Sequence, residues 1–350
     1  MSVRQFDEWH YVRRVAITLA LVGLAYMIWR LSGVALLLFA AVLLAVVLRA
    51  LADLIARHTP VPAQWTLTLT ILVLSAFVVG FLILFGAQVS AQFALSMERL
   101  PAAIDAAGDR LGIDDLRAEM ERSLEPGQVR SFIAQAASFG YTFIGAAADL
   151  LLVIVAAVYL AADPKLYRRG TAKLLPPNQH ARIFDAMDAT GAALRLWFWG
   201  QLATMAVVGI ASGLAYWWIG LPSPLVLAII AALTNFVPFI GPIAGAVPAL
   251  IFALAIDQET VLWTAGAVLI IQQIEGNVLT PFIQRRAVMM PPVVILFAIV
   301  VFGFLFGILG VLLAVPLAVA ITVLVKKLWV RQTLGEETEV PGEAAQSVPT

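Results

Sequence analysis

Apolar residues form long stretches along this chain, and charged residues interrupt them only at intervals. A helix needs about 20 mostly apolar residues to cross a bilayer, and several of the stretches reach that length. We expect a short turn at Arg30, Ser32 and Gly33 to divide the first apolar region into two spans. The pattern predicts an all-α, polytopic integral membrane protein with about six full spans. The stretches without Asp, Glu, Lys or Arg are 15–29, 31–48, 58–97, 131–148, 150–162, 196–256, 260–274 and 287–325.

The apolar region 225–256 has the wrong length for ordinary spans. It must begin and end on the same side of the membrane, yet it is too short for two full crossings. The sequence predicts a break at 235–242, where Pro238 and Pro242 lack backbone donors and Gly241 permits unusual dihedral angles. We therefore expect a broken or re-entrant hairpin of two half-length helices.

Residues 292–325 pose the same problem, because one straight helix there would be about 51 Å long at 1.5 Å per residue. We expect a second broken or re-entrant hairpin. Irregular backbone at membrane depth is tolerated where it is buried in protein or lines a watery cavity. The hinge and break positions assigned to both hairpins and to the polar segment between them are Gly245, Pro281, Gly307, Gly310 and Pro316.

The polar segments complete the predicted organisation of a single transmembrane domain over 1–330. Residues 88–137 form an extracytoplasmic amphipathic arm, which either packs against the membrane or a neighbouring subunit or covers a permeation path. Residues 163–195 form a basic helical loop in the cytoplasm, and 331–350 form a disordered acidic tail. Most Lys and Arg lie in the loops of one side, which places both termini in the cytoplasm.

Composition supports a membrane location and excludes several other classes. Apolar residues make up 62% of the chain and charged residues 13%, against roughly half and a quarter in soluble proteins. The zero net charge gives no indication of a nucleic-acid partner. The absence of Cys excludes disulfides and thiolate chemistry. With three His and no metal-ligand spacing, phosphate-binding loop or nucleophile motif, we expect no enzyme, no cofactor and no metal site.

Polar residues inside apolar spans are the candidate functional groups, because they are costly in lipid. Asp149 lies in the fourth span and has either a structural partner or a transport role. A second cluster lies at the end of the apolar stretch 260–274 and just after it, where Gln273, Asn277 and Thr280 share one helical face. Glu275 points elsewhere unless Gly276 unwinds the helix. The candidate pathway residues are Asn235, Pro238, Gly241, Pro242, Gln273, Glu275, Asn277, Thr280 and Asp149.

Three motifs in register give this chain a specific resemblance. They are the run 233–242 (LTNFVPFIGP) with Gly245 and Pro248, the run 275–281 (EGNVLTP), and the run 307–310 (GILG) followed by 314–317 (AVPL). Together they resemble the autoinducer-2 exporter (AI-2E) family, and the span layout fits from about residue 15 to 330. Where that family often has His-Pro, this chain has Met290-Pro291, which puts proton coupling through that position in doubt.

The resemblance implies a bacterial inner-membrane protein that is homo-oligomeric and exports autoinducer-2 or exchanges sodium for protons. Our first hypothesis is a transporter that moves a small polar solute past Asn235, Glu275 and Asn277, with Glu275 and Asp149 as candidate coupling carboxylates. A cation–proton antiporter, a channel and a non-transporting membrane scaffold remain open as alternatives.

Overall fold

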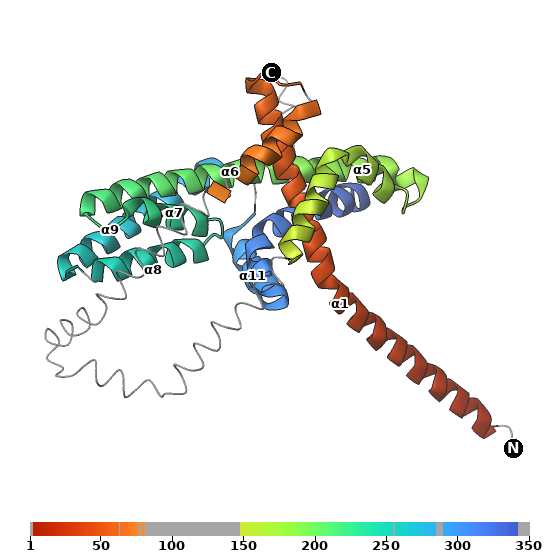
Figure 1. Ribbon diagram of the computed structural model, residues 1–350. Coiled ribbons are helices and arrows are strands. Elements are labelled where there is room, and N and C mark those ends of the chain that lie inside the picture. The colour runs from red at the N-terminus through yellow and green to blue at the C-terminus, as the bar shows by residue number, and fades with distance from the viewer. Residues whose placement is uncertain are drawn as a thin grey trace.

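A computed structural model describes residues 3–62, 64–76, 79–80, 148–254, 256–284 and 290–341 (Figure 1). Every regular element in these ranges is helical. Three of their helices are long and apolar enough to cross a membrane, and a pair bent by 92° gives a fourth candidate. The predicted all-α, polytopic class is therefore confirmed. The helices are α1 (Val3–His58), Gln64–Ala76, Ala148–Ala162, α5 (Pro164–Ala172), η1 (Pro177–Gln179), α6 (His180–Ile219), α7 (Pro224–Thr234), α8 (Ile240–Leu254), α9 (Gln258–Ile274), η2 (Glu275–Gln284), α11 (Pro292–Leu324) and η3 (Val325–Leu334).

The turn predicted at residues 30–33 is wrong, because α1 is one helix of 56 residues. The Ser32 hydroxyl donates to the Trp29 carbonyl at 2.5 Å within the helix and so does not stabilise a turn. The segment has no proline to interrupt the backbone hydrogen bonds. A single Gly in a helix costs only about 1 kcal/mol relative to Ala. The N-terminal half of α1 projects from the rest of the molecule (Figure 1).

Four helices, α6, α7, α8 and α9, pack around one another in a closed ring, each against its two neighbours. Small residues bring α6 and α7 together. A Cβ added at Gly209 would lie 2.9 Å from the Ala232 Cβ, and one at Gly213 would lie 3.2 Å from the Ala228 Cβ. Small residues let helix backbones approach closely. In lipid the hydrophobic effect does not drive helices together, so close packing of this kind stabilises their association.

The predicted break between residues 235 and 242 is confirmed. Helix α7 ends at Thr234 and α8 begins at Ile240, and Phe239 between them has the left-handed φ of 66°. Gly241 lies against the Thr234 carbonyl and Gly245 against Ala231, so α8 runs back antiparallel to α7. A side chain at Gly241 would collide with that carbonyl, so glycine is required for the close approach.

The predicted bend in 292–325 is also confirmed, and it lies at Gly307. This residue has φ 63° and ψ −143°, outside the helical region and favourable only for glycine. Gly310 lies directly against the Phe302 carbonyl, which shows that the two arms of α11 fold back on each other at the turn. Pro316 lies inside the second arm and is buried.

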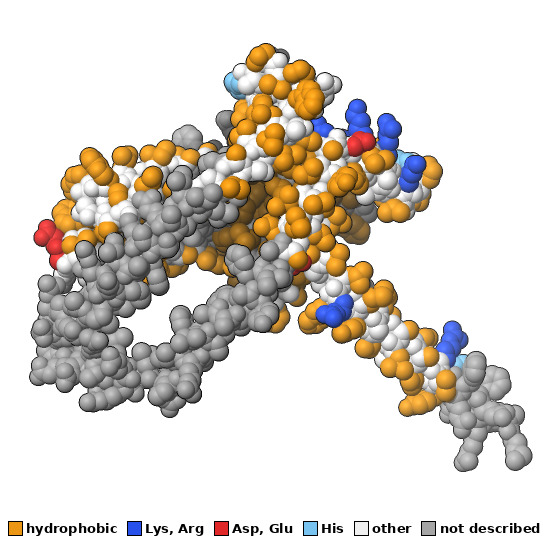
Figure 2. Space-filling view, in the orientation of Figure 1, with side chains coloured by type: hydrophobic (Ala, Val, Ile, Leu, Met, Phe, Trp, Pro, Cys, Tyr) orange, Lys and Arg blue, Asp and Glu red, His pale blue; other side chains and the backbone are white. Residues whose placement is uncertain are grey.

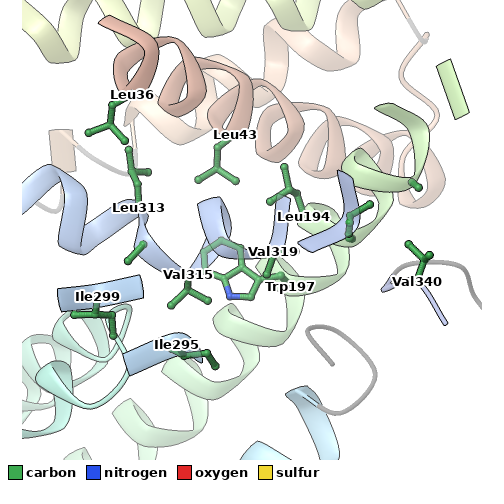
Figure 3. Close-up of a cluster of buried hydrophobic side chains, with 14 residues drawn as sticks. Leu36, Leu43, Leu194, Trp197, Ile295, Ile299, Leu313, Val315, Val319 and Val340 are labelled. Carbon is green, nitrogen blue, oxygen red and sulfur yellow. The ribbon is translucent and has the colours of Figure 1, made fainter. Parts of the chain in front are cut away.

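The largest apolar core joins α1, α6 and α11. Figure 3 shows its side chains pointing toward one another from the three helices. In this cluster Trp197 of α6 is 3% exposed and Val319 of α11 is fully buried. Helix α6 therefore links two halves, because its first half belongs to this core and its second half to the four-helix ring.

The ends of several helices are held together by charged side chains. Arg49 of α1 donates from Nε to the Ala161 carbonyl at 2.5 Å and from Nη2 to the Ala162 carbonyl at 3.0 Å. A cation beside the last carbonyls of a helix is favourable. Arg195 of α6 pairs with Asp53 of α1 at 3.1 Å. The basic loop predicted at 163–195 is helical and forms α5, η1 and the start of α6.

The C-terminal segment differs from the disordered tail predicted over 331–350. Residues up to Leu334 belong to η3, and the chain then returns to the body, where Val340 is 2% exposed within the core. Arg331 donates to the Thr338 carbonyl and Lys326 to the Glu339 carbonyl at 2.8 Å. These backbone acceptors and one apolar anchor order the segment to residue 341. Residues 342–350 and the predicted arm 88–137 lie outside the described residues.

The surface is dominated by apolar side chains on the helices, including the projecting part of α1 (Figure 2). Large apolar residues such as Phe304, which is 88% exposed, are not covered by other residues of the described part of the chain. Exposed apolar area of this extent on a polytopic protein is solvated by lipid. Basic side chains gather over α5, and acidic ones lie where α8 meets α9, at the other end of the ring (Figure 2).

Candidate functional site

Asn235, the first residue after α7, lies where three elements meet. Its position in the break deprives its carbonyl of the helical donor that a continuing helix would supply. The amide Nε2 of Gln201 in α6 donates to this carbonyl at 2.8 Å. The Asn235 side-chain Nδ2 in turn donates to the Glu275 Oε1 at 3.0 Å. A chain of hydrogen bonds thus runs from α6 through the break to the first residue of η2.

The Asn235 side chain is almost fully buried, at 1% exposed. Its Oδ1 accepts no hydrogen bond from the described residues. Buried amides are usually satisfied at both ends, so an open acceptor marks a polar place inside an apolar bundle. Asn235 is therefore a buried residue that donates a hydrogen bond to Glu275, and its Oδ1 is an acceptor that none of the described residues uses.

A small pocket, with a cavity volume of about 20 Å³ and partly open to the surroundings, lies inside the ring of four helices. Its walls are mostly apolar, and the polar groups that face it are Ser212 and Tyr216 from α6, Gln272 from α9 and Glu275 from η2. An apolar pocket with a few convergent polar groups is the usual form of a small-ligand site. Its lining residues are Val208, Ser212, Tyr216, Ala231, Pro242, Gly245, Ala246, Val268, Ile271, Gln272 and Glu275.

The structure divides the predicted pathway residues into groups. Pro242, Gly245 and Glu275 line the pocket, whereas Asn235 lies behind Glu275 and holds it. Pro238 and Gly241 belong to the break and do not face the pocket.

The polar residues of the 272–280 cluster face different ways. Gln273 and Asn277 do share a face, as predicted, and Asn277 Nδ2 donates to Gln273 Oε1 at 3.2 Å, but both are exposed. Gln272 and Glu275 instead face the pocket. The side chains of Thr280 and Pro281 lie outside the described residues.

Gln272 and Glu275 continue the α-helical face of Val268 and Ile271, and the backbone widens after them. Residues Glu275–Gln284 form a π-helical segment, with wider turns than the α-helix assumed from the sequence. Pro281 lacks the N–H that an α-helix would donate to the carbonyl of Asn277, so a wider turn is favoured there. Widened turns often occur at functional sites, because they redirect side chains.

Asp149 is placed apart from this site. It is exposed at the start of the helix Ala148–Ala162, which packs against α1 through Val153, Ala157 and Ala161. Among the described residues, no hydrogen bond or ion pair joins Asp149 to the Asn235–Glu275 pair. Its transport role stays a prediction.

Three residues of α6 in or next to this site were missed by the sequence reasoning. Gln201, Ser212 and Tyr216 are buried on one face of the second half of α6, which has no charged residue. The available signal was their spacing, since 201, 208, 212 and 216 recur at helical intervals on a single face. Among the described residues, no group of His, Cys, Asp and Glu is placed to hold a metal ion.

Comparison with known families agrees with the motifs that lie at this site. Residues 16–329 match the family described as AI-2E family transporter. The chain belongs to this family. The resemblance stated from the sequence is confirmed, with nearly the same boundaries. Because this is a family of transporters, the prediction that the chain is not an enzyme is confirmed as well.

Curated relatives of this AI-2E chain carry only provisional names of transport proteins and permeases. YrrI of Bacillus subtilis (strain 168) is 38% identical over 149 residues, which are 41% of this chain and 41% of YrrI. YueF of the same organism is 31% identical over 163 residues, 45% of this chain and 43% of YueF. The permease PerM of Escherichia coli (strain K12) is 30% identical over 211 residues, 59% of this chain and 57% of PerM. The chain thus spans about half the length of the relatives it matches.

Proposed function

We propose that this AI-2E chain moves a small polar solute, with autoinducer-2 as the first candidate, through the ring of α6, α7, α8 and α9. The observation that carries the proposal is Glu275, a carboxylate held by Asn235 on the wall of a pocket inside an apolar helical bundle. A buried charge in such surroundings is expensive and is kept where it contacts a polar visitor or a partner. Gln272, Ser212 and Tyr216 add hydrogen-bonding groups on the same wall.

The membrane arrangement is part of this proposal. The two hairpins, α7–α8 and the folded α11, enter the bilayer and turn back at 235–239 and at Gly307, within about six full spans in total. Both termini lie in the cytoplasm of a bacterial cell, at its inner membrane. The contacts of Arg49, Arg195 and Lys327 support this, because they gather basic residues of distant segments at one level of the molecule. The chain assembles as a homo-oligomer.

Flux measurements on the purified protein in liposomes test the assignment. In Glu275→Gln the side chain keeps its size but loses its charge, and we expect autoinducer-2 flux to fall about tenfold or more, equivalent to about 1.4 kcal/mol. Glu259→Gln is the matched control, because Glu259 lies on α9 outside the pocket and accepts a hydrogen bond only locally, from Trp263. Wild-type flux in Glu275→Gln would remove Glu275 from the pathway. A loss of flux in Asn277→Ala would instead place the exposed Gln273–Asn277 face on the pathway.

Cation–proton antiport is a second candidate, favoured by the carboxylate on the pocket wall and the open acceptor of Asn235. Carboxylates and amide oxygens are ligands that small hard cations prefer. A pH-sensitive dye inside the liposomes separates the two functions, since added sodium changes the internal pH only in the antiporter. Asp149→Asn in the same assay tests the exposed carboxylate as a coupling group.

A further inference from the structure

Gln201 is a polar residue that neither the motifs nor the family resemblance single out. It lies in the middle of α6, with 4% of its surface exposed, among apolar neighbours. An amide in such a place is unfavourable unless its hydrogen bonds are made inside the protein. Its donor could have bonded its own helix, as the Thr204 hydroxyl does to the Gly200 carbonyl at 3.1 Å, but it reaches another element instead.

The target of Gln201 is the backbone of the break. The Asn235 carbonyl that it binds at 2.8 Å is one that the end of α7 leaves without a helical donor. A second contact from α6 lies close by, where the rings of Trp197 and Phe236 meet edge to face at 5.7 Å. Helix α6 therefore contacts two consecutive residues of the break, one by a hydrogen bond and one by an aromatic contact.

The contact between α6 and the break also affects the pocket. Because the Asn235 side chain donates to Glu275 at 3.0 Å, the position of Asn235 helps to fix where Glu275 points. Glu275 lines the pocket, and Asn235 and Gln201 do not. Neither amide is thus placed to touch a solute, and both act through the carboxylate.

We propose that Gln201 is the positioning residue of the pocket: it fixes the break between α7 and α8 against α6 and, through Asn235, holds Glu275 on the pocket wall. The placement of a solute beside Glu275 rests on the proposed function, whereas the hold on the break does not. Loss of the Gln201 hydrogen bond leaves only the aromatic contact of Trp197 with Phe236 at this place, so the break packs less firmly on α6 and Glu275 is less firmly held on the pocket wall.

A thiol-labelling experiment tests the hold without any knowledge of the solute. The chain has no cysteine, so Ser212→Cys on the α6 wall of the pocket is a unique reporter. The rate of its reaction with a small methanethiosulfonate reagent is measured in liposomes. We expect Gln201→Leu to speed labelling about fivefold or more, since one buried hydrogen bond shifts a local equilibrium by this order.

Thr204→Val is the matched control, because it removes a buried hydroxyl one turn away that donates within α6, to the Gly200 carbonyl. We expect it to change labelling less than about twofold. If Gln201→Leu does not accumulate as folded protein, Gln201→Met replaces it with a side chain of similar length. Unchanged labelling in a folded Gln201 variant, or equal acceleration by Thr204→Val, overturns the proposal.

Flux kinetics provide the second readout. We expect Gln201→Leu to raise the KM for autoinducer-2 about tenfold in the wild type and to add no further change in Glu275→Gln, because residues that act through one another are not additive. Additive effects would mean that Gln201 does not act through Glu275 and would overturn the positioning role. If Gln201→Leu speeds labelling but the protein moves no solute, the positioning role of Gln201 stands and the proposed function is refuted.

Discussion

Gly245 of α8 offers a test of the packing that forms the pocket. A Cβ added there would lie 2.7 Å from the Thr234 Oγ1 and 2.9 Å from the Ala231 Cα, both in α7. The Ala231 backbone cannot rotate away, so α8 must move from α7 by several tenths of an ångström. Overpacking of this kind costs about 1–3 kcal/mol, whereas replacing a helical Gly by Ala gains about 0.5–1 kcal/mol. The overpacking term is larger, and we expect a net loss of up to about 2.5 kcal/mol for Gly245→Ala.

Gly266→Ala is the control with the opposite expected sign. Gly266 lies in α9 of the same ring, and nothing lies within 4 Å of a Cβ placed there. Only the higher helix propensity of alanine remains, so the free energy of unfolding of this variant should rise by about 0.5–1 kcal/mol. Reversible unfolding in mixed micelles, followed by circular dichroism, gives both free energies. A Gly245→Ala protein as stable as Gly266→Ala would refute the close approach of α7 and α8.

Three further changes test contacts that hold the helices together, each by the same unfolding measurement. Asp185→Asn should cost about 1.5–3 kcal/mol, because Lys327, at 6% exposed, loses a charged acceptor at 2.8 Å; the loss should be smaller for Asp188→Asn, whose partner Arg168 has a side chain 36% exposed. Arg49→Met should cost about 1–3 kcal/mol through the carbonyls that it leaves unbonded, and equal stability would show that water replaces the arginine. Val340→Asp should release the segment after η3, seen as new cleavage by a protease between residues 335 and 341; continued protection would contradict the burial of Val340.

The two chain breaks were predictable from sequence because their causes are local. Proline removes a donor wherever it stands, and glycine alone adopts the dihedral angles found at Gly307 or the close approach at Gly241. The all-α class and the apolar surface were predictable for a similar reason, since they depend on the length and composition of each stretch and not on its neighbours. Glu275 was found as well, because a carboxylate among apolar residues is visible in sequence.

What the tertiary structure decided are the pairings between distant segments. The sequence indicated a turn at Ser32 where α1 continues, because a weak helix breaker inside a long helix is overruled by the backbone hydrogen bonds around it. It placed Gln273 and Asn277 on the functional face, but the packing of α9 in the four-helix ring turns Gln272 and Glu275 toward the pocket instead.

The same limit applies to Gln201, whose role exists only because the chain folds the Asn235 carbonyl against it across 34 positions of sequence. Nothing in the residues near Gln201 indicates this partner. Local chemistry therefore determined where this protein breaks its helices, and the three-dimensional packing determined which polar groups those breaks bring together, because a hydrogen bond between distant residues depends on the path of the chain between them.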